Sequence, residues 1–342
     1  MKVSESMSGF SEKADNKVRG TSVAIDNGGS KALAIRFDRD FRPVASVKTG
    51  SLRFNTNSPE VIDQRVREMI AGLGFEQGDV IDDLCGVFPA AVAEIFKKHI
   101  PVTHVSNFGE LGTSLAAAEI FGDGIIAICG TGVSIFARYR GKTYALGGYG
   151  SLISDEGSGY YIARQAYTAA IHAFEGRGPG TVLTDIIARK YGGNGPQDFR
   201  EAVFSIYGRE SKSLVSEIAS LTPLVVKAAE SDEVAAQILR DAGKLVGEQL
   251  LALVRSNSLP HDLPIAVSGS VWKNDPVLFG AFKDTVAGTL SDPEIVIPRF
   301  LPVVGPVILK MLEKNRESGI DHLTDEDERI LDQYSREFGF SV

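Results

Sequence analysis

Short runs of β-branched and other apolar residues alternate along the chain with segments in which apolar residues recur every three or four positions. The short runs predict strands, and the periodic segments predict helices. We expect strands at residues 21–25, 32–37, 44–48, 85–88, 102–105, 125–129, 135–139, 264–268 and 296–298. We expect helices at residues 61–73, 90–98, 111–121, 161–172, 181–190, 197–206, 215–229 and 233–256, one after residue 272, and a last one within 301–314. Strands interleaved with helices in this way predict an α/β fold.

The composition adds limits to this picture. The chain has 342 residues, 43% of them hydrophobic and 23% charged, as in soluble globular proteins. This length suits two domains of roughly 100–200 residues each. The net charge is −8 and no basic run is interleaved with aromatic residues, so we expect no nucleic-acid partner. An anionic substrate would then have to be held by local dipoles or by a metal ion.

The two ends of the chain depart from the alternating pattern. Residues 1–20 are polar, rich in Ser, Lys and Glu, and without period, so we expect a disordered leader. Residues 315–342 are strongly charged around a helical core, which predicts a solvated C-terminal helix. No apolar run is long enough to span a membrane, and no signal-peptide core is present, so we expect a cytoplasmic protein.

Two glycine-rich turns occupy similar places in the predicted fold. The first reads DNGGSK, from Asp26 to Lys31, and joins the first two expected strands. The second reads CGTGVS and joins the strands at 125–129 and 135–139. The backbone N–H groups of such turns can converge on a phosphate, although each turn alone is also typical of an ordinary hairpin. Their repetition predicts duplicated domains that face one phosphate chain.

The stretch GGYGSLISDEGSGYY, from Gly147 to Tyr161, is the richest in glycine and surrounds one acidic pair, Asp155 and Glu156. Glycine loses the most backbone entropy on ordering, so this density favours a loop that lies against a ligand. A pair of tight turns between strands is the alternative interpretation.

Three further positions are candidates for chemistry. Asn55 lies in the loop before the helix at 61–73, where its amide could hydrogen-bond a polyol. Glu110 stands between a strand and a helix, near the positive end of the helix dipole. A carboxylate there is either an ordinary first-turn residue or a catalytic group at the carboxyl end of a strand. The segment SGSVW, from Ser268 to Trp272, has small residues against which a flat ring could lie.

With these loops in order, the chain resembles the N-acetylglucosamine kinase family, part of the BadF/BadG/BcrA/BcrD-type ATPase group in the actin, hexokinase and Hsp70 superfamily. The resemblance covers about residues 22–314 and rests on DNGGSK, CGTGVS, GGYGSLISDEGSGYYI, SGSVWKNDPVL and PRFLPVVGPVI. It implies two actin-like, ribonuclease H-like α/β domains with a nucleotide cleft between them. The small N-terminal domain would span 21–118, and the larger C-terminal domain, with a helical insertion, would span 119–314.

The resemblance also implies cofactors and roles. ATP would be the phosphoryl donor, a sugar the acceptor, and Mg²⁺ the metal ion, with Asp26 acting on its shell through water. Glu110 would be the catalytic base. The sugar would be held by Asn55, Gly148, Asp155 and Glu156. The nucleotide would be held by Asn27, Gly28, Gly29, Ser30 and Lys31 in the first turn, Gly130, Thr131 and Gly132 in the second, and Gly269 and Ser270 in an adenosine loop.

Two positions depart from the family pattern. Asn27 stands where the first loop usually carries a third glycine, which Asn can replace because it also enters left-handed backbone conformations. The family's catalytic aspartate lies in an Asn-Asp-Ala type turn, whereas this chain reads SNFGELGTS. Counting back from Gly130 places Glu110 nearest to that aspartate, whereas matching Asn107 would place Phe108 there. We favour Glu110, because the reaction needs a carboxylate.

The resulting hypothesis is an ATP-dependent kinase that phosphorylates N-acetylglucosamine or glucosamine, at the 6-hydroxyl, and forms a homodimer as the resemblance implies. Two alternatives stay open. A non-catalytic sugar- and ATP-binding regulator of the same fold would explain the altered turn at Glu110. An activator-type ATPase would hold an iron–sulfur cluster between two subunits, but Cys85 and Cys129 lie inside apolar runs and are expected to be buried thiols.

Overall fold

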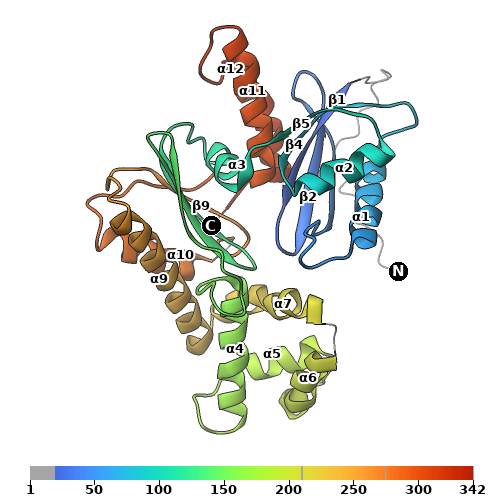
Figure 1. Ribbon diagram of the computed structural model, residues 1–342. Coiled ribbons are helices and arrows are strands. Elements are labelled where there is room, and N and C mark those ends of the chain that lie inside the picture. The colour runs from blue at the N-terminus through green and yellow to red at the C-terminus, as the bar shows by residue number, and fades with distance from the viewer. Residues whose placement is uncertain (1–19, 209–210, 274, 342) are drawn as a thin grey trace. The chain divides into compact units, whose positions relative to one another are not determined.

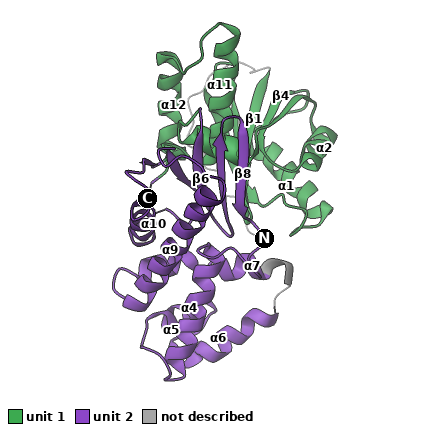
Figure 2. Ribbon diagram, turned by 60° about the vertical axis from the view of Figure 1, so that its left-hand side comes forward, with its two compact units in different colours: residues 1–121, 298–340 green, residues 122–297, 341–342 purple. Residues whose placement is uncertain are grey.

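The structure is a computed structural model that describes residues 20–208, 211–273 and 275–341. The leader expected at residues 1–20 therefore lies outside the described residues, except for Gly20. The chain forms two compact units, shown in different colours in Figure 2. Unit 1 comprises residues 1–121 and 298–340, and unit 2 comprises residues 122–297 and 341–342. No helix in the described part of the chain is long and apolar enough to span a bilayer.

Unit 1 is built on a five-stranded sheet of order β3-β2-β1-β4-β5. Its strands are β1 (Thr21–Asn27), β2 (Lys31–Phe37), β3 (Pro43–Gly50), β4 (Ile81–Val87) and β5 (Val102–Asn107). The first three strands pair antiparallel, and β4 and β5 continue the sheet in parallel with β1. Its helices are α1 (Pro59–Gly72), α2 (Ala90–His99), α3 (Gly109–Ala117), α11 (Gly305–Glu317) and α12 (Asp325–Phe338), with a 3₁₀ turn at Pro302–Val304.

Both faces of this sheet are buried, by helices from opposite ends of the chain. Helices α1 and α2 pack on one face through residues such as Ile62 and Phe96 (Figure 1). Helices α3, α11 and α12 pack on the other face through residues such as Val307 and Leu331. Coverage of both faces is the usual condition for parallel strands.

The C-terminal segment therefore differs from its expected form. We expected the larger domain to end at residue 314 and a solvated helix to follow it, yet residues 298–340 contribute to the core of unit 1. Helix α12 is exposed on one side only, and the Tyr334 hydroxyl, buried on the other, donates to the Phe41 carbonyl oxygen at 2.7 Å. In α11, Lys310 contacts Asp83 of β4 at 2.7 Å. The domain boundaries inferred from the resemblance, 21–118 and 119–314, stay a prediction.

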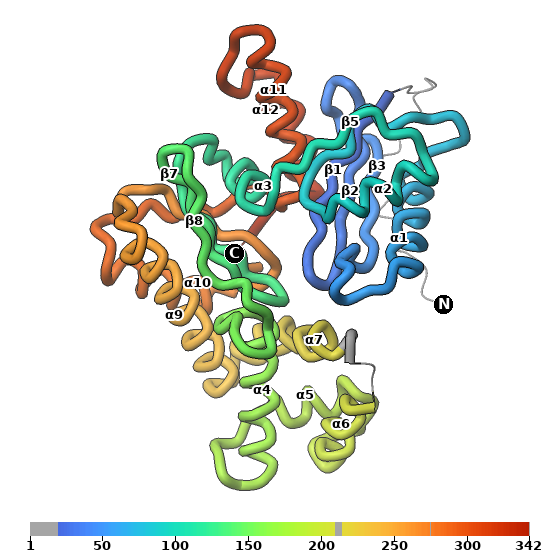
Figure 3. The backbone as a smooth tube through the Cα atoms, in the orientation of Figure 1, coloured from blue at the N-terminus to red at the C-terminus, as the bar shows by residue number. Residues whose placement is uncertain are grey.

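Unit 2 repeats the design of unit 1, with the strand order β10-β9-β6-β7-β8. Its strands are β6 (Gly124–Cys129), β7 (Val133–Tyr139), β8 (Lys142–Gly147), β9 (Ile265–Ser268) and β10 (Ile295–Val296). Again an antiparallel meander, drawn in green in Figure 3, continues into parallel strands. The predicted duplication is thus present in the strand order.

Helices make up the rest of unit 2. They are α4 (Gly159–Phe174), α5 (Leu183–Lys190), α6 (Phe199–Ser205), α7 (Ser211–Ala219), α8 (Thr222–Ala228), α9 (Glu233–Ser256) and α10 (Pro276–Ala287), with 3₁₀ turns at Pro196–Asp198 and Ile206–Gly208. The helix expected at 215–229 is in fact two helices, α7 and α8. Pro223 lies in the first turn of α8, where its missing N–H costs no hydrogen bond.

Candidate active site

The first glycine-rich turn joins β1 to β2, as the sequence predicts. Gly28, Gly29 and Ser30 form the turn, and the Gly28 amide donates a hydrogen bond to the Lys31 carbonyl oxygen at 2.9 Å. Lys31 opens β2 and is exposed. A small-residue backbone with a lysine beside it suits an anionic ligand.

Asn27 lies in strand β1 and not in the turn itself. It pairs with Ala32 of β2, and it is not among the residues with positive φ. The expectation of a left-handed backbone conformation at Asn27 is therefore wrong. Its side chain is buried, and Oδ1 accepts a hydrogen bond from the Leu52 amide at 2.8 Å. This side chain fixes the loop after β3, so only the backbone of Asn27 stays a candidate for nucleotide binding.

Two of the predicted carboxylates lie close together in unit 1. Burial, and after it the Glu110 carboxylate, raise the pKa of Asp26 from 3.8 to about 6, against the opposing effect of Lys31 and Arg53. Glu110 lies in the first turn of α3, half-exposed, and its Oε1 contacts Arg53 Nη2 at 3.0 Å. The end of β1 and the start of α3 thus bring together two acidic and two basic groups.

The loop that carries Arg53 and Asn55 is held at several points. Ser51 Oγ donates to the Gly28 carbonyl oxygen at 2.7 Å, which ties the loop to the first turn. Asn57 Nδ2 donates to the carbonyl oxygens of Ser51 and Arg53 at 3.1 and 3.0 Å. Asn55 is exposed, between these fixed residues. The loop is therefore rigid enough to present Arg53 and Asn55 in defined positions.

In unit 2, three segments that are far apart in sequence meet at the end of β6. The Gly159 amide donates to the Gly130 carbonyl oxygen at 2.8 Å, and the Val271 amide donates to the Cys129 carbonyl oxygen at 3.1 Å. A Cβ at Gly269, whose φ is +102°, would lie 2.3 Å from the Cys129 carbonyl oxygen, so only glycine fits there. The structure thus brings together the predicted residues Gly130, Thr131, Gly132, Gly148, Asp155, Gly269 and Ser270.

Asp155 is buried in this region, with the left-handed φ of 65° that non-glycine residues seldom adopt. A Cβ at Gly132 would lie 2.4 Å from its Oδ2, so the carboxylate lies directly against the second turn. Burial raises the pKa of Asp155, against hydrogen bonds from Ser151 and from the N–H groups of Val133 and Gly150. Its Oδ1 has no hydrogen-bond partner among the described residues. A buried acceptor without a partner is costly unless a ligand supplies the donor.

The acidic pair divides in the structure. Whereas Asp155 is buried, Glu156 is exposed, and its carbonyl oxygen accepts a hydrogen bond from Gln249 Nε2 at 2.8 Å. Gly148 is also exposed, with φ of +76°, and its amide donates to the Val133 carbonyl oxygen at 3.0 Å. The two carboxylates therefore have different surroundings, which their adjacency in the sequence could not reveal.

The described residues include no group of three or more His, Cys, Asp or Glu side chains that could hold a metal ion. Mg²⁺ is usually held by one or two carboxylates, water and substrate phosphates, and not by a cage of side chains. Asp26 fits such an ion, because a cation would relieve the unfavourable proximity of its carboxylate to that of Glu110.

Arg53 is not among the site residues predicted from the sequence. Its position could have indicated a role, because Arg53 is a basic residue in an acidic chain and lies two positions before Asn55, a candidate sugar contact. Its contact with Glu110 joins residues 57 positions apart, which no local pattern can predict.

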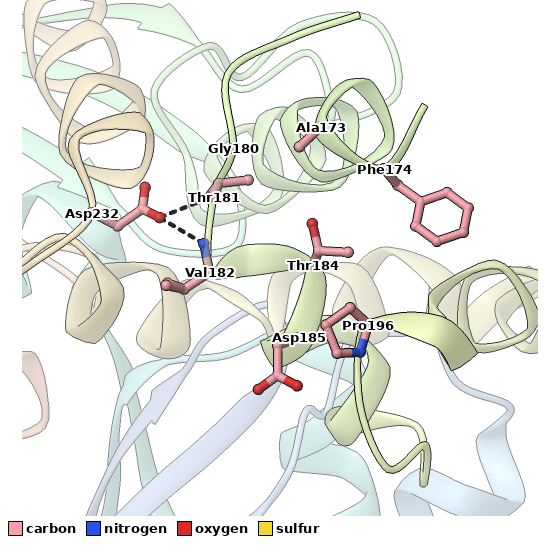
Figure 4. Close-up of a pocket in the computed structure, with 9 residues that line it drawn as sticks. All are labelled: Ala173, Phe174, Gly180, Thr181, Val182, Thr184, Asp185, Pro196 and Asp232. Carbon is pink, nitrogen blue, oxygen red and sulfur yellow. Dashed lines mark hydrogen bonds between the residues drawn. The ribbon is translucent and has the colours of Figure 1, made fainter. Parts of the chain in front are cut away.

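A separate hollow of about 600 Å³ lies among the helices of unit 2 (Figure 4). One of its two acidic residues, Asp232, accepts hydrogen bonds from the Thr181 hydroxyl at 2.9 Å and from the amides of Val182 and Ala235 at 2.7 and 2.9 Å. These bonds hold the start of α9 to the segment before α5. None of the predicted site residues lines this hollow.

A family model described as the BadF/BadG/BcrA/BcrD ATPase family matches residues 23–309 of the chain. A curated relative, the N-acetylmuramic acid/N-acetylglucosamine kinase of Clostridium acetobutylicum, is 28% identical over 290 residues. That match covers 80% of this chain and 92% of the relative.

Two solved structures share the fold. A candidate N-acetylglucosamine kinase from Chromobacterium violaceum has a TM-score of 0.60 and 24% identity, over 85% of this chain and 99% of that chain. A ROK family glucokinase from Streptomyces griseus, in complex with glucose and AMPPNP, has a TM-score of 0.55 and 15% identity, over 84% and 97%. These likenesses confirm the predicted α/β fold of actin-like ATPases.

Proposed function

Because the chain belongs to the BadF/BadG/BcrA/BcrD ATPase family, we propose that it transfers a phosphoryl group from ATP to the 6-hydroxyl of an amino or N-acetylated hexose. The enzyme class predicted from the sequence, an ATP-dependent phosphotransferase, is confirmed, since the curated relative is a kinase. N-acetylglucosamine and glucosamine are the acceptors expected from the sequence. The name of the Clostridium acetobutylicum relative adds N-acetylmuramic acid to the sugars to be tested.

One observation in the chain's own residues supports this proposal: the Glu110 carboxylate acts electrostatically on Asp26, which lies at the end of the strand that leads into the first glycine-rich turn. Phosphoryl transfer requires in-line positioning, charge neutralisation and a base for the attacking hydroxyl. Glu110 would accept the proton of the sugar hydroxyl, a contribution of roughly 10²–10⁴-fold to the rate. Asp26 would hold Mg²⁺ through water. When bound, the ion would neutralise phosphate charge that a chain of net charge −8 cannot.

The nucleotide would be bound mainly by backbone groups. In the first turn these belong to Asn27, Gly28, Gly29 and Ser30, with the Lys31 ammonium as a point charge. In the second region they belong to Gly130, Thr131 and Gly132, and the base and ribose would lie against Gly269 and Ser270. The absence of side chains from most of these positions lets the backbone approach a ligand closely.

Asp155 would supply the central acceptor for the sugar, since its Oδ1 is buried without a hydrogen-bond partner among the described residues. A sugar hydroxyl donates the hydrogen bond that this oxygen lacks. Asn55, Gly148 and Glu156 are exposed and would bind the sugar at its outer edge.

An acceptor screen tests the proposal. Purified protein with ATP and Mg²⁺ is incubated with some twenty sugars, ADP release is followed, and the phosphorylated product is identified by mass spectrometry and NMR. We expect a 6-phosphate of an amino or N-acetylated hexose. Release of ADP that no sugar stimulates would contradict the proposal. Sedimentation of the same sample tests the proposed homodimer, and fractionation of cells tests the proposed cytoplasmic location.

A regulator that binds sugar and ATP without transfer is the second candidate. The observation that favours it is the Arg53–Glu110 ion pair, because the cation occupies one oxygen of the carboxylate that would otherwise be open to a sugar hydroxyl. Calorimetry showing that both ligands bind, with no transfer to any sugar in the screen, would support the regulator.

The two cysteines do not support the activator-type alternative, which needs thiolates to hold an iron–sulfur cluster. Cys85 and Cys129 are fully buried in β4 and β6, and burial raises the pKa of each thiol. Iron–sulfur clusters need accessible thiolates.

A further inference from the structure

We propose that Arg53 is a positioning residue for Glu110 and that it holds the carboxylate of the base in the orientation that transfer requires. This inference rests on the proposed kinase function and adds a residue that neither the sequence motifs nor the relatives assign.

The direct contact is an ion pair between Arg53 Nη2 and Glu110 Oε1 at 3.0 Å, with the two side chains 39% and 36% exposed. An exposed pair of this kind contributes little to stability, so protein folding alone gives no strong reason for it. Without a partner, a flexible glutamate at the start of a helix visits several rotamers, and the contact with Arg53 selects one of them for Glu110. Fixing one rotamer raises the fraction of time in which the base is correctly placed.

The fixed backbone of Arg53 gives the contact its precision. The Arg53 carbonyl oxygen accepts from Asn57 Nδ2 at 3.0 Å, and the Arg53 amide donates to Ser51 Oγ at 3.3 Å. Arg65 Nη1 in turn donates to Asn57 Oδ1 at 2.7 Å. The guanidinium that meets Glu110 therefore extends from an anchored segment.

The same anchor reaches the first glycine-rich turn. Ser51 Oγ donates to the Gly28 carbonyl oxygen at 2.7 Å, and the neighbouring Leu52 amide donates to Asn27 Oδ1 at 2.8 Å. The chain of contacts runs from the proposed phosphate loop through Ser51 and Arg53 to the proposed base. Arg53 thus couples the position of Glu110 to the loop that would hold the phosphates.

The chemistry of the pair is compatible with a working base. A guanidinium stays protonated in proteins and cannot take the proton from the hydroxyl, so Glu110 remains the proton acceptor. The ion pair engages Oε1, and Oε2 is the atom that would receive the proton. No covalent bond to Arg53 forms or breaks in this role.

The test is a double-mutant cycle on the full-length protein. Arg53→Met, Glu110→Gln and the double variant are compared with wild type by steady-state transfer from labelled ATP, at varied ATP and sugar, to the acceptor that the screen identifies. Arg53→Lys restores the charge on a different geometry. Arg42→Met is the matched control, because Arg42 is an exposed loop arginine of the same unit whose partner is Asp40. Thermal unfolding and ATP titration of each variant separate folding and nucleotide binding from transfer.

We expect Arg53→Met to lower kcat about 10- to 100-fold, the scale of a misplaced catalytic group, while the KM values for ATP and sugar change less than about threefold. In the Glu110→Gln background the same substitution should lower the residual rate less than about twofold. Arg53→Lys should recover part of the rate, and Arg42→Met should match wild type.

Three outcomes would overturn the inference. Equal losses in both backgrounds would show that Arg53 acts independently of Glu110. A rise in the KM for sugar or ATP with kcat unchanged would make Arg53 a ligand-binding residue. An Arg53→Met variant as fast as wild type would remove any role in transfer. Failure of the proposed function looks different, since wild type itself would then transfer phosphate to no sugar, and both proposals would fall.

Discussion

The two units share one strand order but differ in the charges beside their buried carboxylates. In unit 1, the buried Asp83 forms an ion pair with Lys310, and the half-exposed Glu110 forms one with Arg53. In unit 2, Asp155 and Asp275 are buried with no ion pair among the described residues. All three buried acids keep one oxygen without a hydrogen-bond partner there. A repeated backbone thus carries different side-chain chemistry, with a cation beside Asp83 in one copy and none beside Asp155 and Asp275 in the other.

The backbone itself repeats closely at one point. In unit 1, Gly86 has φ of +133°, and a Cβ there would lie 2.0 Å from the Ile25 carbonyl oxygen of β1. In unit 2, Gly269 has φ of +102°, and a Cβ there would lie 2.3 Å from the Cys129 carbonyl oxygen of β6. In each copy a glycine from the parallel neighbour lies against the strand that leads into the glycine-rich turn. The shared requirement is steric, whereas the differences lie in the side chains.

The largest expected effect comes from adding a methyl group at the two glycines that lie against a carbonyl oxygen. Gly86→Ala and Gly269→Ala should each lower the free energy of unfolding by at least about 3 kcal/mol, since the new methyl group meets a carbonyl oxygen in a strained backbone. Denaturant unfolding measures this loss. Gly74→Ala and Gly141→Ala are the matched controls, because both glycines have positive φ but nothing within 4 Å of the added atom. They should cost only about 1 kcal/mol. A Gly86 or Gly269 variant as stable as its control would disprove the close approach.

The next effect sharpens the contrast between the two adjacent acids of unit 2. Asp155→Asn keeps the shape of a buried acceptor but alters its hydrogen bonding, so kcat/KM for the sugar should fall about 10- to 100-fold. Glu156→Gln, at an exposed position, should change kcat/KM less than about threefold. Initial rates at varied sugar and saturating ATP give both numbers. Equal effects of the two substitutions would mean that burial does not separate their roles.

Much of the fold follows from the sequence, because local patterns carry it. The apolar runs locate all but one of the longer strands. The exception is β8 (Lys142–Gly147), a short strand in which no residue is buried. The helical spacing of Ile330, Tyr334 and Phe338 is visible in the sequence of α12. The many charged residues around them led us to expect a solvated helix, so the burial of this face was not predicted.

The candidate site is less predictable, because its geometry depends on contacts between distant segments. Glycine-rich turns give the backbone of the loops, since glycine is required where a chain turns sharply or lies close to another. The sequence does not reveal that the Asn27 side chain holds Leu52, or that Arg53 reaches Glu110. Nor could it separate Asp155 from Glu156, because burial depends on tertiary packing.

The smallest expected effect concerns the other buried acid of unit 2. Burial raises the pKa of Asp275 from 3.8 to about 6, while its Oδ1 caps α10 through the Leu278 amide at 3.0 Å. A folded-state pKa above the unfolded value means that stability is lost as pH rises from about 4 through 6. Asp275→Asn keeps the cap and removes the buried charge, so it should stabilise the protein by about 1–2 kcal/mol at pH 7.

The gain at Asp275 should shrink as the pH falls below about 6, where the folded wild type takes up a proton, and should vanish only below about pH 4, where the unfolded wild type is protonated as well. Denaturation midpoints at pH 7 and pH 4.5 measure the difference. A stabilisation that is the same at both pH values would exclude titration of Asp275 as its cause.

The central claim is that Glu110 is the base of a sugar kinase, and one variant tests it most directly. Glu110→Gln keeps the size of the side chain and its place in α3 but removes the proton acceptor. We predict that sugar-dependent ADP production falls by roughly 10²–10⁴-fold, while ATP titration gives the wild-type dissociation constant. A Glu110→Gln variant that turns over sugar at the wild-type rate would contradict the account.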